Sequence, residues 1–194
     1  ELAGQIRNDG IDILVDLSGH MAGNRLLVFA RKPAPVQVTA WGYANGTGLE
    51  TIDYFLADPV VVPLVERSLF AEEIFDLPCF VCYEPPEYLP EVSPQPALRG
   101  RPFTFACINR VEKISDRILA LWGRILAELP EAELLVKAWG LDDAKHRQHF
   151  VRRLRKAGIG EARVRLFGNS PHREHLKSYQ DADLVLDPFP HGGG

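Results

Sequence analysis

A lysine and two histidines stand where apolar runs give way to polar residues, the place where parallel-sheet proteins carry their chemistry. Lys113 comes shortly after the apolar run 103–108. Its positive charge could offset negative charge that grows on a departing phosphate, which needs a counter-charge if no metal supplies one. From spacing alone, however, a lysine in such a loop is more often simply solvated.

His172 and His175 are three residues apart at the predicted start of a helix, so their side chains share one helix face. The pair could bind a ligand, with Arg173 assisting, or it could cap the helix or face solvent. A metal pair completed by His191 or Asp187 is a further reading, which we do not favour.

His20 and two glycine-rich segments complete the set of candidates. His20 follows the strand-like run 11–17, and Gly42 opens the segment 42–48 after the next such run. Backbone amides of a glycine segment can approach phosphate oxygens closely. Such a segment follows the last apolar run as Gly192, Gly193 and Gly194.

Two short motifs could indicate metal or redox chemistry. The DxD motif at residues 181–183 precedes a predicted strand at a helix end, whereas a metal-binding DxD follows a strand, so we interpret it as structural. Cys79 and Cys82 form a CxxC motif, but no second pair completes a four-cysteine zinc site. With Cys107 as the third cysteine, we expect structural thiols and a reducing, cytoplasmic location.

The elements that must position these residues alternate along the chain. Short runs that are apolar on both faces predict buried parallel strands covered by helices. The predicted strands are residues 11–17, 36–41, 53–57 and 73–77, then 103–108, 133–138, 163–167 and 184–187. The predicted helices are residues 2–9, 24–32, 115–129, 142–157 and 171–180. The second half is therefore a Rossmann-like β-α-β-α-β-α-β unit.

Residues 84–100 separate the two halves. They contain five prolines and few apolar residues, which is the composition of a semi-rigid linker. We therefore predict an α/β protein with two Rossmann-like lobes, residues 1–83 and 101–194. Because the chain starts without methionine and stops in a glycine segment, we expect both lobes to be incomplete.

Composition excludes several classes of partner. The net charge of -4 and the pI of about 5.9 argue against nucleic acid, and no apolar run reaches the roughly 18 residues that a membrane span needs. The basic helix predicted at residues 142–157 is interpreted as a charged solvent face. We therefore expect neither nucleic-acid nor membrane binding.

Seven segments, in order, resemble blocks of the catalytic region of the O-linked N-acetylglucosamine transferase family. In the first half they are 16–20 (DLSGH), 31–37 (RKPAPVQ), 41–43 (WGY) and 52–54 (IDY). In the second half they are 109–114 (NRVEKI), 171–176 (PHREHL) and 186–190 (LDPFP). The resemblance implies a GT-B fold, a UDP-sugar donor, inversion at the anomeric carbon and no metal.

The same resemblance assigns roles to residues. Lys113 corresponds to the lysine that binds the diphosphate, and His172 and His175 to residues that contact the nucleoside. It also implies a protein acceptor and helical repeats upstream of the chain. One departure concerns the segment 42–46, which reads GYANG where the family usually shows GYPGT.

These observations predict a fragment of an inverting glycosyltransferase. It would move N-acetylglucosamine, or a related sugar, from UDP to serine or threonine of proteins, with Lys113 and His20 as catalytic residues. The alternative is a non-catalytic nucleotide-binding or scaffold module of the same fold.

Overall fold

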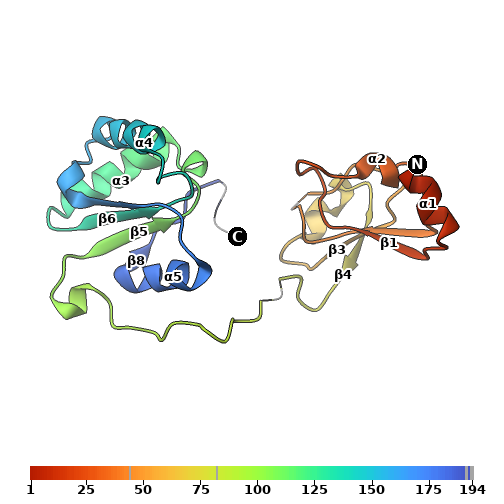
Figure 1. Ribbon diagram of the computed structural model, residues 1–194, viewed down its shortest axis with the longest axis horizontal. Coiled ribbons are helices and arrows are strands. Elements are labelled where there is room, and N and C mark those ends of the chain that lie inside the picture. Colours follow the sequence, from red (N-terminus) through yellow and green to blue (C-terminus); the bar gives the residue numbers. More distant parts are fainter. Residues whose placement is uncertain (44, 82, 191, 193–194) are drawn as a thin grey trace. The chain divides into compact units, whose positions relative to one another are not determined.

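The computed structural model describes residues 1–43, 45–81, 83–190 and 192 of the chain (Figure 1). They fall into two compact units, Glu1–Glu84 and Pro85–Gly194. Each unit is built on a parallel sheet, and each is described here by itself. Among the described residues, no helix is long and apolar enough to cross a bilayer.

The first unit carries a four-stranded sheet in the order β1-β2-β3-β4. All three strand pairs are parallel, as the apolar runs predicted. The strands are β1 (Ile13–Asp16), β2 (Val36–Thr39), β3 (Tyr54–Ala57) and β4 (Glu73–Asp76). The helical segments are α1 (Leu2–Asn8), α2 (Leu26–Phe29) and the 3-10 helix η1 (Leu64–Leu69).

The helix predicted at residues 24–32 is shorter in the structure. It covers only Leu26–Phe29, and Lys32 has a φ of 44° just before Pro33. A left-handed residue followed by proline cannot continue a helix, so the chain turns directly toward β2. The apolar side of α2 packs Leu26 and Phe29 against Ile52.

The second unit has the strand order β7-β6-β5-β8, and all its strand pairs are parallel. The strands are β5 (Thr104–Ile108), β6 (Glu133–Lys137), β7 (Val164–Phe167) and β8 (Leu184–Val185). The helices are α3 (Asp116–Glu128), α4 (Ala144–Lys156) and α5 (His172–Lys177). Short 3-10 turns are η2 (Ala97–Arg99), η3 (Val111–Lys113), η4 (Glu161–Arg163) and η5 (Ser178–Asp181).

This order creates a switch point between β5 and β8, because the chain winds to one side of β5 and then returns to its other side. Helices α3 and α4 cover one face of the sheet, and α5 lies on the other (Figure 1). The main core lies under α3 and α4, where Ile118, Trp122 and Phe150 pack on the strands. Ser115 caps α3, its Oγ accepting from the amide of Ile118 at 3.3 Å.

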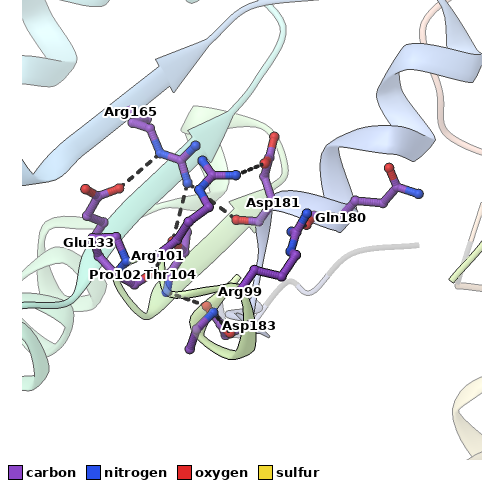
Figure 2. Close-up of polar contacts among 10 residues, drawn as sticks. Arg99, Arg101, Pro102, Thr104, Glu133, Arg165, Gln180, Asp181 and Asp183 are labelled. Carbon is purple, nitrogen blue, oxygen red and sulfur yellow. Dashed lines mark hydrogen bonds and ion pairs between the residues drawn. The ribbon is translucent and has the colours of Figure 1, made fainter. Parts of the chain in front are cut away.

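Residues 85–100, predicted to be a separate linker, group with the second unit. Contacts with η5 and with the residue before β8 hold their C-terminal part: Ala97 N donates to Asp183 Oδ1 at 2.9 Å. Arg99 donates to the carbonyl of Gln180 at 2.7 Å; Figure 2 labels both residues. Asp183 Oδ2 also accepts from Thr104 N at 2.8 Å, at the start of β5.

The other carboxylate of the DxD motif belongs to the same network. Asp181 Oδ1 lies 2.9 Å from a guanidinium nitrogen of Arg101 (Figure 2). The two aspartates therefore attach residues 97–104 to η5 and β8. These contacts give both carboxylates a structural role.

Candidate functional site

The loops after β5 and β8 meet at the switch point. Lys113 lies half-buried in η3, and its Nζ donates to the carbonyl oxygen of Gly192 at 2.6 Å. Beside it, Asn109 Nδ2 lies 3.3 Å from Asp187 Oδ1. In doubly wound sheets ligands bind at such a switch point, beyond the carboxyl ends of the strands.

A Cβ at Gly192 would lie 2.4 Å from Asp187 Oδ2, so the Asp187 side chain would have to move to admit any other residue there. The contact that the structure describes is through the Gly192 carbonyl group, whereas the sequence predicted amides turned toward phosphate. Gly193, Gly194 and His191, named with it from the sequence, lie outside the described residues.

A pocket of about 210 Å³ opens next to the switch point, at the carboxyl ends of β5, β6 and β7. It is lined by Asn109, Lys137, Trp139, Asn169 and His175, among others. Lys137 is 7% exposed and Trp139 is 74% exposed. Neither residue is predicted as a site residue from the sequence, although a lysine that ends an apolar Rossmann strand is a usable signal.

His175 projects from α5 into this pocket and is half-buried. Burial, the Lys137 charge and then the His172 ring lower the pKa of His175. Its imidazole is therefore neutral at pH 7 and offers a flat, uncharged ring to a ligand.

His172 lies beside His175, as the three-residue spacing predicted. The two rings stack with centroids 6.5 Å apart and planes 16° apart. His172 Nδ1 lies 2.9 Å from the hydroxyl oxygen of Tyr88, which orients its ring. Arg173, between them in sequence, is exposed. Within the described part of the chain, no three His, Cys, Asp or Glu residues could jointly hold a metal ion.

His20 and Gly42 belong to the first unit, where two loops are held together. His20 Nε2 lies 3.1 Å from the carbonyl oxygen of Thr47, and its ring meets the ring of Tyr43 edge-on at 5.5 Å. The amide of Thr47 donates to Glu72 Oε1 at 2.7 Å. The His20 ring is exposed, so one side of it remains open to solvent.

Gly42 is placed by packing between these loops. A Cβ on Gly42 would lie 1.8 Å from the carbonyl oxygen of Leu17, and one on Gly19 would lie 2.4 Å from Tyr43 Cβ. The two glycines therefore let the loops after β1 and β2 pack backbone to backbone. This contact accounts for Gly42 without a ligand. Ala44, part of the unusual GYANG segment, lies outside the described residues.

Two further features fix these loops. The buried carboxylate of Asp16 accepts from Gly19 N at 2.9 Å and from Thr39 Oγ1 at 2.8 Å. Trp41 has a φ of 49°, which is rare for an aromatic residue, and its ring stacks on Phe80. Left-handed non-glycine residues cluster where a loop conformation matters for function.

The two described cysteines, Cys107 and Cys79, differ in burial. Burial, and then the Asp187 carboxylate, raise the pKa of the Cys107 thiol on β5 to about 12. Cys79 Sγ lies 3.1 Å from the carbonyl oxygen of Val81. Cys82, the second cysteine of the CxxC motif, lies outside the described residues.

Two parallel sheets, each in its own unit, give an α/β architecture that matches a solved protein of the GT-B type. The chain resembles a solved mutant of the Thermobaculum terrenum O-GlcNAc transferase, with a TM-score of 0.87 and 38% identity. That alignment covers 99% of this chain and 36% of the other. The fold alone is also shared with a chain of the GtfA/B complex, at 15% identity and a TM-score of 0.52.

Sequence comparisons give the family. Residues 1–82 match the model of glycosyl transferase family 41. The chain is 40% identical over its whole length to the probable UDP-N-acetylglucosamine–peptide N-acetylglucosaminyltransferase SPINDLY of Arabidopsis thaliana. It is 29% identical, over 94% of its length, to the enzyme SEC of the same plant, which carries the same functional name.

Residues 1–82 thus match glycosyl transferase family 41, and the chain as a whole is similar to O-linked N-acetylglucosamine transferases. It spans about a fifth of the length of these curated relatives. The resemblance, the GT-B fold and the parallel α/β architecture predicted from the sequence are confirmed.

Proposed function

We propose that the protein containing this chain is an inverting glycosyltransferase that moves N-acetylglucosamine from UDP to serine or threonine of proteins. The observation that carries the proposal is the switch point itself. There the Lys113 ammonium group lies 2.6 Å from the Gly192 carbonyl oxygen, next to a pocket that His175 lines. The names of the relatives support this donor and this type of acceptor.

The chemistry requires one bond to form and one to break. The acceptor hydroxyl oxygen attacks the anomeric carbon from the side opposite the diphosphate, and the bond from that carbon to the diphosphate oxygen breaks. The departing UDP carries away the bonding electrons, so negative charge grows on its oxygen. Lys113 offsets that charge in a half-buried setting, where such an interaction is stronger than in water.

The proton of the acceptor hydroxyl must also be removed. His20 is the candidate base of the first unit, since its ring is exposed and is oriented by Thr47 and Tyr43. The proposal uses no metal, because Lys113 and the backbone supply the counter-charge. Arg173, exposed next to His172, adds positive charge on the nucleotide side.

Sugar transfer by the intact protein tests the proposal. UDP-N-acetylglucosamine labelled in the sugar is incubated with the protein and a serine- and threonine-containing acceptor protein, and label on the acceptor is measured. Transfer with inverted configuration is expected. A protein that binds UDP but neither transfers the sugar nor hydrolyses the donor would instead be the non-catalytic module.

The proposal includes a protein acceptor, helical repeats outside this chain and a cytoplasmic location. The cysteine content supports a reducing compartment, since three cysteines in one chain cannot all pair. Mass spectrometry of modified peptides from cells with and without the protein would identify acceptors and their compartment.

A further inference from the structure

Lys137 is a buried lysine with no ion-pair partner in the described part of the chain. It ends β6 and is 7% exposed. Among the described residues, no hydrogen bond or ion pair involves its ammonium group. Buried charges in proteins are normally paired, because removing an ammonium group from water is costly.

The acidic side chains nearest along the chain are engaged elsewhere. Glu133, on the same face of β6, pairs with Arg165 at 3.2 Å (Figure 2). The carboxylate of Asp142 accepts from the amide of Asn169 at 2.7 Å. The Lys137 side chain instead lines the pocket of about 210 Å³, which is open to a ligand.

The other residues that line this pocket indicate which kind of ligand it can bind. The ring of His175 and the exposed indole of Trp139 both line it, and flat aromatic rings are the side chains on which nucleobases stack. Asn109 and Asn169 add polar lining. A lysine ammonium has three donors and no acceptor, so it recognises an acceptor oxygen.

Position separates this pocket from the phosphate end of the site. Lys113 and Gly192 belong to the loops after β5 and β8, whereas Lys137 ends β6. Neighbouring strands lie about 4.8 Å apart, so β6 and β8 are separated by roughly 10 Å. A nucleotide lying across the strand ends, with its phosphates at Lys113, places its base at Lys137.

We propose that Lys137 donates a hydrogen bond to a carbonyl oxygen of the donor's nucleobase and thereby selects uracil or guanine over adenine. Uracil and guanine carry a carbonyl oxygen on an exposed edge, and adenine presents an amino group there instead. This inference rests on the proposed nucleotide-sugar function and adds base selection to it.

Calorimetric titration of the intact protein with UDP, GDP and ADP tests the assignment. The variant is Lys137→Met, which keeps the length and apolar stem of the side chain and removes its charge. The matched control is Lys156→Met, which removes an exposed lysine from the end of α4, on the opposite face of the sheet. Thermal melting establishes that each variant is folded.

Lys137→Met should weaken the better bound of UDP and GDP by about 10- to 100-fold, the loss expected for one hydrogen bond from a charged donor. Binding of ADP should change by less than about threefold, and Lys156→Met should change none of the three. Equal weakening of all three nucleotides would overturn base selection in favour of a phosphate or ribose contact. Unchanged binding of all three would remove Lys137 from the site.

Failure of the proposed function would look different. In that case the wild-type protein itself would bind neither UDP nor GDP, whatever residue stands at position 137. Wild-type binding with an unaltered Lys137→Met profile overturns only the role of Lys137.

Discussion

At the scale of residues, the site combines two lysines in different surroundings. Lys113 is half-buried, and its ammonium group donates to a backbone carbonyl, with no carboxylate partner among the described residues. Lys137 is buried and lies against His175. Neither lysine forms an ion pair with a described carboxylate, so both positive charges are available to an anionic or polar ligand.

Lys113→Ala in the intact protein should lower the rate of sugar transfer by roughly 10²–10³-fold, the loss typical of one oxyanion donor. The UDP-sugar dissociation constant should rise less, since charge on the leaving oxygen grows only as the bond breaks. Turnover and equilibrium binding are measured separately, and Lys113→Arg is expected to retain part of the rate. A folded Lys113→Ala protein with full turnover would show that the lysine is a bystander.

The lowered pKa of His175 predicts a pH dependence of stability. The imidazole of His175 titrates at about pH 6.5 in the unfolded chain and at a lower pH in the folded protein. Between these two pH values the unfolded state therefore binds more protons than the folded state. The neutral ring therefore favours folding above pH 6.5, and this advantage is lost as pH falls from about 6.5 to the folded pKa.

Melting temperatures between pH 7 and pH 5 check this expectation. Stability of the wild type should fall more steeply with acidification than that of His175→Gln. His149→Gln serves as the matched control, because His149 lies exposed on α4, and it should follow the wild type more closely. Parallel curves for wild type and His175→Gln would contradict a lowered pKa.

At the scale of elements, loops after neighbouring strands are fixed by close backbone contact. Gly19 and Gly42 allow the loops after β1 and β2 to touch. The buried carboxylates of Asp16 and Glu72 accept hydrogen bonds from backbone amides of nearby loops. The described residues of the loops around His20 are therefore held by contacts within the fold, which is a condition for placing a reactive group.

Gly42→Ala should destabilise the first unit by about 1–3 kcal/mol, because the new methyl group overlaps the backbone of Leu17. Gly4→Ala in α1 is the control: no atom lies within 4 Å of its added Cβ, and alanine favours a helix by about 0.5–1 kcal/mol. Chemical denaturation measures both variants. Wild-type stability of Gly42→Ala would mean that Gly42 is retained for ligand contact instead.

At the scale of the whole molecule, the charge that grows on the leaving diphosphate is assigned to Lys113 and backbone groups. The carboxylates of the DxD motif are occupied by Arg101 and by backbone amides. Sugar transfer by the intact protein should therefore keep its rate in EDTA. Loss of activity in EDTA, with recovery on addition of a divalent cation, would instead support the interpretation of His172 and His175 as metal ligands.

Much of the architecture could be predicted from the sequence, because it depends on local patterns. Apolar runs predicted all eight strands and their parallel pairing, since both faces of a covered parallel strand are buried. Strand-end positions likewise predicted that Lys113 and His175 lie at one edge of a sheet. The extent of α2 was wrong because its end depends on Lys32 adopting a left-handed conformation before Pro33.

The sequence by itself determined which residues stand at strand ends and which family motifs they form. Only the tertiary structure decided which ends meet: the order β7-β6-β5-β8 brings Lys113 to Gly192, 79 residues away. It also decided that Lys137 is buried, with no ion-pair partner in the residues that the structure describes, and that Gly42 serves loop packing. The physical reason is that periodicity specifies the face on which a side chain lies, whereas strand order and side-chain partners depend on packing between segments distant in sequence.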